Sequence, residues 1–397
     1  MDVLISPDRI APLAAGEVAR ALAQSWREHG HTVLERPMSD GSAGMVEVIR
    51  AVRGGDLLPV PVVPAGAGSG DRPVPVELLH VPGRSGGTAY VDGSLVLGAG
   101  TDDHERLLAT GTTAPVADLL LAALGTGASR VILGLDQAAV HDGGRGLLDR
   151  LTERWGLAGD GSSTPWSALR ARLAGVHLVV AVATDLPLLG LTGAGAALAR
   201  WPGITAAAAQ DAERVVGEYT AGLLQTAEAA DAVAEAGHRT DPGLGGLVPT
   251  VRAPHTVVRP SRDYGTGAGG GAASALAMLG ARLLPGADVV AAEIELAAAV
   301  ESADLVVTGT TTLDGSAMHE SVVATVGRAA MAVGLPVVAV GAEVQTSRRD
   351  GARVGVSATY PVVDAPTTRS RTSQTVESDP WTALVRRGER IRRTWTQ

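Results

Sequence analysis

The chain has 397 residues, 45% of them hydrophobic, and a formal charge of −9, so it can build two domains with sizeable cores and lacks the basic face that nucleic-acid binding favours. It contains no cysteine and no lysine, which excludes disulfides and thiolate metal sites and leaves arginine or backbone N–H groups to bind phosphate. No apolar run reaches the roughly 18 residues of a membrane helix, and the acidic start MDVLISPD is unlike a signal peptide. We therefore expect a soluble cytoplasmic protein without membrane or nucleic-acid partners, and the composition leaves its oligomeric state open.

The first fifty residues alternate between strand and helix patterns. Residues 1–6 and 32–36 predict strands. Apolar residues at helical spacing predict a helix over 13–28 with one buried stripe, and a second helix over 45–52. A β-α-β-α unit of this kind favours a parallel sheet, because parallel strands need a crossover connection such as a helix.

The remaining elements continue this alternation and predict an α/β fold. Residues 54–87 are dominated by Pro, Val and Gly, which indicates short extended segments leading into another domain. Apolar runs then predict strands at 88–97, 131–133, 176–182, 304–309, 336–341 and 354–363. Helices are predicted at 114–124, 166–173, 193–225, 322–333 and 381–393, and polar or Gly-rich loops at 237–246 and 366–378. The last helix is expected to expose its basic residues, which are Arg386, Arg387, Arg390, Arg392 and Arg393.

The stretch 130–146, RVILGLDQAAVHDGGRG, has the pattern of a ligand-binding turn. Its strand ends at Gly134, and the following loop carries Gln137, His141 and Asp142 before two glycines lead into a helix. Ligands gather at such points because loop side chains and free helix N–H groups converge there. The alternative is an ordinary strand-to-helix turn with solvated acids.

Five aspartates share this kind of position after a predicted strand: Asp8, Asp40, Asp142, Asp185 and Asp314. Carboxylates that converge on one site can bind Mg²⁺ through oxygen or accept a proton from a substrate hydroxyl. The alternative is helix N-capping, which aspartate performs at many turns. Both interpretations remain open for each of the five residues.

Residues 265–271 place five glycines in seven positions before a helix. Backbone N–H groups there could wrap a phosphate at the helix N-terminus, which would suit a chain without lysine. Gly265, Gly267 and Gly270 match G-x-G-x-x-G, but no clear strand precedes them, so the dinucleotide-binding context is missing. The histidines show no zinc-binding spacing, and GRSGG at 83–87 is interpreted as a turn and not as a nucleophile elbow.

Taken in chain order, these turns resemble the bacterial two-domain glycerate kinase family. The resemblance is collinear over about residues 1–365 and is carried by SPDRIAPLAAGEVA at 6–19, SDGSAGM at 39–45, GLDQAAVHDGGRG at 134–146, ATDLPL at 183–188, the glycine-rich stretch 265–286 and TGTTTLDGSA at 308–317. It implies a kinase that uses ATP and Mg²⁺ to phosphorylate a small hydroxy acid, with glycerate as the first expectation for the substrate.

The resemblance also implies how the domains are arranged. One α/β domain with a parallel sheet would be assembled from residues 1–57 and 284–365, and a second α/β domain, residues 58–283, would be inserted into it. The active-site cleft would lie between the two domains. Residues 366–397 would form a polar linker and a C-terminal helix.

The family motifs imply roles for the aspartates and glycines that they contain. Asp185 and Asp142 would orient or deprotonate the substrate hydroxyl, and Asp314 and Asp40 would hold the metal ion. Substrate or phosphate binding would involve Asp8, Asp40, Gly41, His141, Gly143, Gly144, Gly265, Gly267, Gly269 and Gly270.

Several charged or amide residues of the family motifs are replaced in this chain. A motif lysine has no counterpart near residues 10–12, and the motif Glu, Thr-Asn, Glu and Arg positions carry Ala43, Val140-His141, Thr310 and Thr312. Phosphoryl transfer needs positive charge around the phosphate oxygens, which Mg²⁺ and Arg9, Arg145 or Arg262 could supply. Two alternatives therefore stay open: a catalytically inactive relative with a binding or regulatory role, and a kinase with a shifted hydroxy-acid substrate.

Overall fold

The computed structural model describes residues 1–68, 72–98, 101–157, 164–239, 258–315, 317, 319, 321–363 and 379–396. The chain forms two compact units, of which unit 1 comprises Met1–Gly54 and Pro285–Gln397, and unit 2 comprises Gly55–Leu284. The joints thus fall at 54/55 and 284/285, and the C-terminal helix belongs to unit 1. The predicted linker 366–378 lies outside the described residues.

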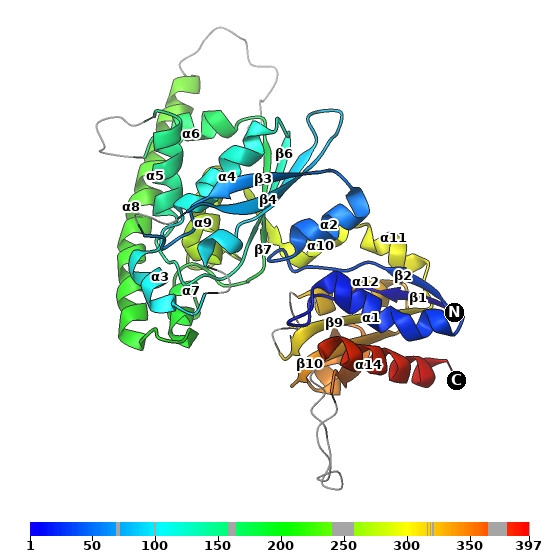
Figure 1. The fold of residues 1–397 in the computed structure, drawn as a ribbon. Coiled ribbons are helices and arrows are strands. Elements are labelled where there is room, and N and C mark those ends of the chain that lie inside the picture. The colour runs from blue at the N-terminus through cyan, green and yellow to red at the C-terminus, as the bar shows by residue number, and fades with distance from the viewer. Residues whose placement is uncertain are drawn as a thin grey trace. The chain divides into compact units, whose positions relative to one another are not determined.

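Unit 1 contains a parallel sheet that interleaves the two ends of the chain. In the described part of the chain its strand order is β11-β10-β9-β1-β2, and all four neighbouring pairs are parallel (Figure 1). The strands are β1 (Asp2–Ile5), β2 (Thr32–Glu35), β9 (Leu305–Leu313), β10 (Val337–Val344) and β11 (Val356–Pro361). Its helices are α1 (Ala15–Glu28), α2 (Met45–Arg53), α10 (Gly286–Glu293), α11 (Leu296–Glu301), α12 (Val322–Ala332), α13 (Arg348–Arg353) and α14 (Pro380–Trp395).

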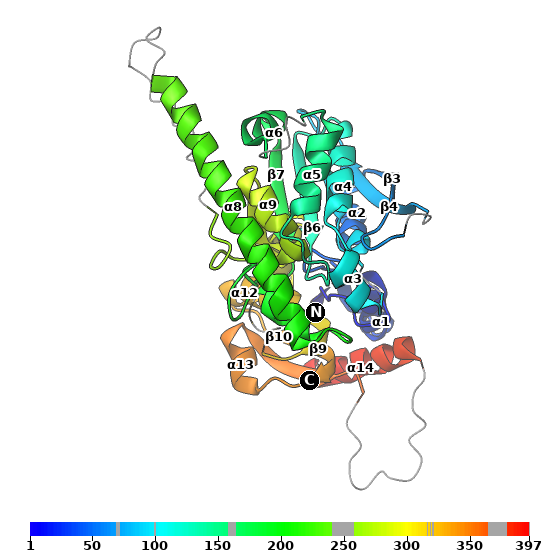
Figure 2. The ribbon, with the colours of Figure 1, turned by 90° about the vertical axis from the view of Figure 1, so that its left-hand side faces the viewer.

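Helix α1 begins and packs as its sequence predicts. Its first turn is closed by Glu17, whose Oε2 accepts the Ala14 N–H at 2.9 Å. Its apolar stripe is fully buried, including Leu22 and Trp26. Helix α14 lies alongside α1 (Figure 2), and Gly388 permits the close approach because a Cβ there would lie 2.7 Å from the Leu22 carbonyl oxygen.

The basic residues of α14 are not all solvated, in contrast to the prediction. Arg387 is buried, its guanidinium lies 5.9 Å from the centre of the Tyr360 ring, and its Nε donates to the Val362 carbonyl at 3.4 Å. Arg392 Nε donates to Ser25 Oγ of α1 at 3.2 Å. These arginines therefore help attach α14 to unit 1, since their stems pack and their donors find partners.

Unit 2 contains a mixed sheet with the order β3-β4-β5-β6-β7-β8. The strands are β3 (Asp56–Val62), β4 (Val74–Val81), β5 (Thr88–Asp92), β6 (Arg130–Leu135), β7 (His177–Val182) and β8 (Arg282–Pro285). β5, β6 and β7 pair in parallel, whereas β3, β4 and β5 pair antiparallel. The helices are α3 (His104–Thr110), α4 (Ala114–Gly125), α5 (Arg145–Arg154), α6 (Trp166–Leu173), α7 (Ala194–Ala197), α8 (Ala206–Arg239) and α9 (Ala272–Met278), with short 3₁₀ turns η1 (Leu95–Leu97), η2 (Leu198–Arg200) and η3 (Ala268–Gly271).

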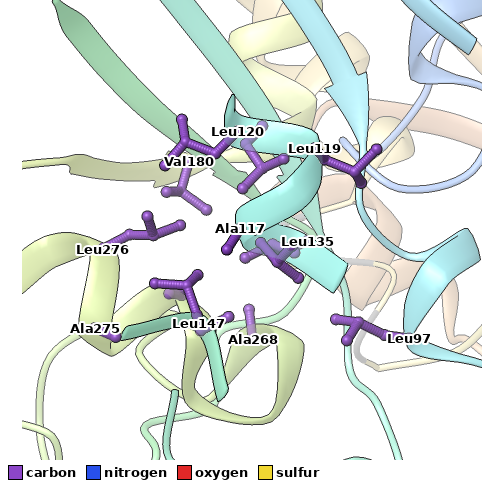
Figure 3. Packing of buried hydrophobic residues seen from close by; sticks show 14 of the residues in the cluster. Leu97, Ala117, Leu119, Leu120, Leu135, Leu147, Val180, Ala268, Ala275 and Leu276 are labelled. Atoms are coloured by element: carbon purple, nitrogen blue, oxygen red, sulfur yellow. The ribbon is translucent and has the colours of Figure 1, made fainter. Parts of the chain in front are cut away.

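The core of unit 2 is built where α4, α5 and α9 meet strands β6 and β7. Figure 3 shows Leu120 of α4, Leu147 of α5, Leu276 of α9 and Val180 of β7 within this cluster, and all four are at most 1% exposed. Among the described residues no single helix is long and apolar enough to cross a membrane, although α3 and α4, which are bent by 79°, pass that test together by length and composition. α8 continues through residue 239, so the predicted loop 237–246 begins within a helix and otherwise lies outside the described residues.

Candidate functional site

In unit 1, three of the predicted aspartates follow neighbouring parallel strands. Asp8 follows β1, Asp40 follows β2 and Asp314 follows β9. Because the carboxyl ends of parallel strands meet at one edge of a sheet, the sheet brings these three loops to the same edge. The loop after β1 is fastened there, since the Asp8 N–H donates to the Gly309 carbonyl at 2.8 Å.

Each of these three carboxylates also organises its own loop. The Arg9 N–H donates to Asp8 Oδ1 at 2.7 Å, and the Ala317 N–H donates to Asp314 Oδ1 at 2.9 Å. Asp40 Oδ1 accepts from both the N–H and the hydroxyl of Ser42, at 2.9 and 2.6 Å. All three carboxylates thus bind groups of their own loops, but none is the N-cap of the following helix, since the N-caps of α1, α2 and α12 are Ala14, Gly44 and Ser321. Asp40 makes these local bonds through Oδ1 alone.

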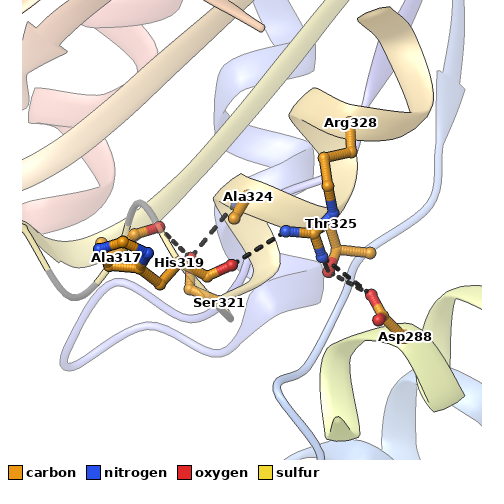
Figure 4. A network of polar contacts seen from close by, with 7 residues as sticks. All are labelled: Asp288, Ala317, His319, Ser321, Ala324, Thr325 and Arg328. Atoms are coloured by element: carbon orange, nitrogen blue, oxygen red, sulfur yellow. Dashed lines mark hydrogen bonds and ion pairs between the residues drawn. The ribbon is translucent and has the colours of Figure 1, made fainter. Parts of the chain in front are cut away.

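The loop that carries Asp314 is held by a polar network that sequence reasoning missed. Arg328 of α12 donates to the His319 carbonyl at 2.9 Å and to Asp288 of α10 at 3.2 Å (Figure 4). Thr325 donates to the same Asp288 oxygen at 2.7 Å, and Ser321 caps α12 and donates to the Ala317 carbonyl. The sequence signal was the spacing of Thr325 and Arg328 on one helix, but it could not identify their shared partner, Asp288, which lies on another helix.

A pocket of about 650 Å³ opens beside Asp8 in unit 1. It is lined by the loop before α1, by the start of α2 and by Thr311 of β9. Ala11, Pro12 and Ala43, which stand at or beside positions where the family motifs carry lysine and glutamate, line its wall. The pocket therefore includes two of the sites where this chain departs from those motifs.

In unit 2, Asp142 forms the structural joint between two helix starts. Its carboxylate accepts hydrogen bonds from Thr112 Oγ1 at 3.2 Å and from the N–H and hydroxyl of Thr113, each at 2.9 Å. It also accepts from the N–H groups of Gly144 and Gly146 at 2.9 and 3.0 Å. Five donors occupy the two oxygens, so the contacts favour the capping interpretation of this residue.

Asp185 is placed differently from Asp142. It is exposed after β7, beside the carboxyl end of β6, and its side chain makes no hydrogen bond with the described residues. Gln137, from the loop after β6, donates to Thr184 Oγ1 at 3.2 Å and so joins the two loops. The structure therefore leaves the Asp185 carboxylate open to a ligand at the carboxyl edge of this parallel segment.

The glycine-rich loop 265–271 is buried and turned towards protein. The N–H groups of Gly265, Gly267 and Gly269 donate to the carbonyls of Asp185, Leu186 and Asp136, at 3.3, 3.0 and 2.8 Å. Three further predicted phosphate donors are also engaged: Gly41 with Ser39 Oγ, Gly143 with the Gly270 carbonyl and Gly144 with Asp142. In this conformation these N–H groups bind the chain itself, which favours a packing role.

We predict that Gly270→Ala destabilises the protein by roughly 3 kcal/mol or more. Gly270 has φ +64°, and a Cβ there would lie 2.1 Å from the Val140 carbonyl oxygen, which is backbone and cannot rotate away. Gly222→Ala is the control, because Gly222 lies exposed within α8 with nothing within 4 Å, and it should stabilise by about 0.5–1 kcal/mol. Urea unfolding midpoints measure both changes, and equal midpoints would contradict the packing role of Gly270.

His141 is buried beside the glycine loop and helix α7. Only 7% of the residue is exposed, and neither ring nitrogen has a hydrogen-bond partner in the described structure. Gly195 of α7 makes room for it, because a Cβ there would lie 3.2 Å from Nε2. Burial lowers the pKa of His141 to about 4, although the neighbouring Asp142 raises it.

We predict that His141 makes stability fall as the pH drops from about 6.5 to about 4. The unfolded chain takes up a proton below its ordinary histidine pKa, whereas the folded chain resists protonation until about pH 4, so the loss is roughly 3 kcal/mol over this window. His141→Leu should flatten the pH dependence of the unfolding free energy, and His177→Gln, at an exposed position, should leave it unchanged. An unaltered slope in His141→Leu would contradict the assignment.

The described residues do not form a ready-made metal site from side chains alone. Within the ranges that the structure describes, no three or more His, Asp or Glu side chains are grouped so that they could hold a metal ion. With the described residues alone, Asp40 and Asp314 are thus not part of an all-protein cage. Mg²⁺ sites commonly use one or two carboxylates with waters and substrate phosphates, and that donor set still fits Asp40 with its second oxygen.

Comparisons with a family model and with known proteins indicate the same family. The model of the glycerate kinase family matches residues 3–396. A glycerate kinase of Bacillus subtilis is 27% identical over 384 residues, covering 91% of this chain and 90% of that protein. The glycerate 2-kinase of Escherichia coli is 26% identical over 357 residues, covering 86% and 84%. An uncharacterized protein of Mycobacterium bovis is 28% identical over 371 residues, covering 92% and 84%.

A crystal structure supports the same fold. A proposed glycerate kinase 2 from Salmonella typhimurium LT2 superimposes with a TM-score of 0.69 and 23% identity, covering 100% of this chain and 98% of that one. This likeness confirms the predicted α/β fold with two domains. Because the family model matches nearly the entire chain, the protein belongs to the glycerate kinase family.

Proposed function

We propose that the protein transfers the γ-phosphoryl group of ATP to a hydroxyl of glycerate or a closely related small hydroxy acid. The observation that carries this proposal is the convergence of Asp8, Asp40 and Asp314 at one edge of the parallel sheet of unit 1, in a chain of the glycerate kinase family. Carboxylates in such loops suit a magnesium–nucleotide complex.

Asp185 is proposed to receive the proton of the substrate hydroxyl. In the transfer, the hydroxyl oxygen forms a bond to the γ-phosphorus, the bond to the β,γ-bridging oxygen breaks, ADP leaves, and the proton passes to the Asp185 carboxylate. Asp142 is less suited to this role because five donors already occupy its oxygens. Asp185 is exposed and has no such donors among the described residues.

Asp40 and Asp314 are the proposed protein ligands of Mg²⁺, which would offset the charge of the phosphate oxygens. Asp40 Oδ1 is held by Ser42, which fixes the orientation of the carboxylate. The chain has no lysine for the phosphates, and two of the three candidate arginines, Arg9 and Arg262, are exposed and make no side-chain hydrogen bond with the described residues. The third, Arg145, lies 4.3 Å from the centre of the Tyr219 ring.

The proposal is tested by ADP release coupled to glycerate, with product detected by phosphorus NMR. We expect phosphorylated glycerate to form only when ATP, Mg²⁺ and glycerate are all present. A panel of small hydroxy acids in the same assay identifies a shifted substrate. Gln137 favours this alternative, because its amide adds a polar group to the loop after β6 and donates to Thr184 after β7. Absence of product with every acid would contradict the kinase proposal.

A catalytically inactive binding protein is the second candidate. It is favoured by Ala11, Pro12 and Ala43, which leave the pocket wall of unit 1 without the lysine and glutamate of the family motifs. Calorimetry separates the two candidates, because an inactive binder would bind glycerate or magnesium–ADP without forming product. Turnover of any hydroxy acid would contradict this second candidate.

A further inference from the structure

We propose that the pocket of about 650 Å³ in unit 1 takes the nucleoside part of the phosphoryl donor, and not the hydroxy acid. This inference rests on the proposed kinase function and assigns one of its two ligands to one unit. The lining residues in the described part of the chain all belong to unit 1.

The size of the pocket favours a ligand larger than a three-carbon acid. Its volume lies within the roughly 300–1,000 Å³ that enclose drug-sized ligands, a class to which a nucleoside belongs. Glycerate would fill a small part of this space and leave most of the wall in contact with water. A purine with its ribose would cover far more of the same wall.

The lining is mostly apolar, as a planar base requires. Leu13 and Ala14 are half-buried and offer apolar carbon to a ligand, whereas Met38, Val48 and Ala15 are themselves covered and only back the wall. A purine face gains by covering apolar carbon, because that area is then removed from water. A carboxylate placed against the same carbons would lose hydration without gaining a donor.

The charges at the pocket are mixed. Of the described lining residues, Asp8 and Glu47 are acidic and Arg9 is basic, and Arg20 lies beside Glu47. A lining with both signs of charge gives no strong attraction for a free carboxylate, and it does not oppose an uncharged nucleoside. Glu47 Oε1 lies 3.5 Å from the position that a Cβ would take on Gly16, so it stands over the start of α1, and Arg20 Nη1 lies equally near that position.

The polar groups of the pocket match the hydroxyls of a ribose. Glu47 is exposed at the pocket, and a carboxylate there can accept from ribose hydroxyls, as acidic residues do in dinucleotide-binding folds. Thr311 adds a hydroxyl that accepts the Ala11 N–H at 3.2 Å and donates to the Arg9 carbonyl at 3.4 Å, so only an oxygen lone pair is left to accept from a ribose hydroxyl. The base would then lie against the apolar wall with the sugar towards Glu47.

The test is adenosine binding to the full-length protein by calorimetry, since adenosine cannot be turned over. We expect wild type to bind adenosine, and Ala43→Phe, which fills the pocket from a half-buried loop position, to lose at least tenfold in affinity for adenosine and for ADP. Ala352→Phe, on the exposed face of α13 and outside the pocket, is the matched control and should bind as wild type does. Circular dichroism and urea unfolding verify that both variants are folded.

Glu47→Gln provides a second, conservative arm that keeps the pocket open. Wild type should bind adenosine more tightly than 2′,3′-dideoxyadenosine, by about tenfold for hydrogen bonds to a charged acceptor, and Glu47→Gln should remove most of that difference. An equal preference in both proteins would overturn the ribose assignment.

The outcomes separate this inference from the proposed function. If Ala43→Phe binds adenosine and ADP as wild type does, or loses glycerate binding instead, the inference is overturned even when turnover of glycerate is observed. If adenosine binds as expected but no hydroxy acid is phosphorylated, the kinase proposal fails and the nucleoside site stands.

Discussion

Replacing Asp142 by alanine is expected to lower the free energy of unfolding by roughly 3–5 kcal/mol. The carboxylate ties Thr113, at the start of α4, to Gly144, at the start of α5, and its removal leaves five donors without their acceptor. Thr113 is fully buried, so water cannot easily replace the lost bonds. The measurement is the urea unfolding midpoint with an unchanged m-value.

Asp142→Asn is the informative intermediate. It keeps the shape of the side chain but turns one acceptor oxygen into a donor that faces N–H and O–H groups, so about half of the loss or more is expected. Asp185→Ala serves as the control because Asp185 is exposed, and its stability should stay within about 0.5 kcal/mol of wild type. If Asp142→Ala unfolds at the wild-type midpoint, the hydrogen-bonded joint does not stabilise the fold.

Replacing Asp185 by alanine is expected to lower kcat by roughly 10²–10⁴, the usual contribution of a general base. The effect should fall on kcat, because the proton is removed during the transfer, whereas binding of the nucleotide should not change. Asp185→Asn should lose as much activity, since its amide cannot accept the proton. Steady-state kinetics with ATP and the accepted hydroxy acid measure both variants.

The matched control for this loss is Asp211→Ala. Asp211 is also an exposed acid of unit 2 but lies on α8, away from the strand ends, so its variant should retain wild-type kcat. A kcat within a factor of three of wild type in Asp185→Ala would remove Asp185 from the mechanism. The unfolding data on the same variant exclude loss of fold as the cause.

Much of the fold could be predicted from hydrophobic periodicity. β1 and β2, and helices such as α1 and α12, have bounds close to those predicted, because each buries one face at a regular spacing. The Pro-rich region 54–87 predicts only short extended segments, and in the structure it forms the antiparallel strands β3 and β4. Pro59 and Pro61 are tolerated because β3 is the edge strand, and Pro75 lies outside the part of β4 that pairs with β5.

The candidate site was predicted at the level of which turn, but not of which contact. An aspartate after a strand can cap, bind metal or accept a proton, and its sequence neighbours do not decide among these. The partners of Asp142 include Thr112 and Thr113, which lie about thirty residues earlier in the chain. The glycines of 265–271 likewise have the sequence pattern of a phosphate-binding loop. In the structure, however, N–H groups of this loop donate to the carbonyls of Asp136 and Asp185.

The sheet of unit 1 has a consequence for synthesis on the ribosome. β1 pairs with β2 thirty residues later but also with β9, about three hundred residues later. Helix α1 likewise packs against α14, at the far end of the chain. Unit 2 is one contiguous segment with its own core, so it emerges whole and can complete its contacts first. The first fifty-four residues must then wait, with the apolar faces of β1 and α1 uncovered, until the last part of the chain is made. Chaperone dependence during translation should accordingly concentrate on this N-terminal segment.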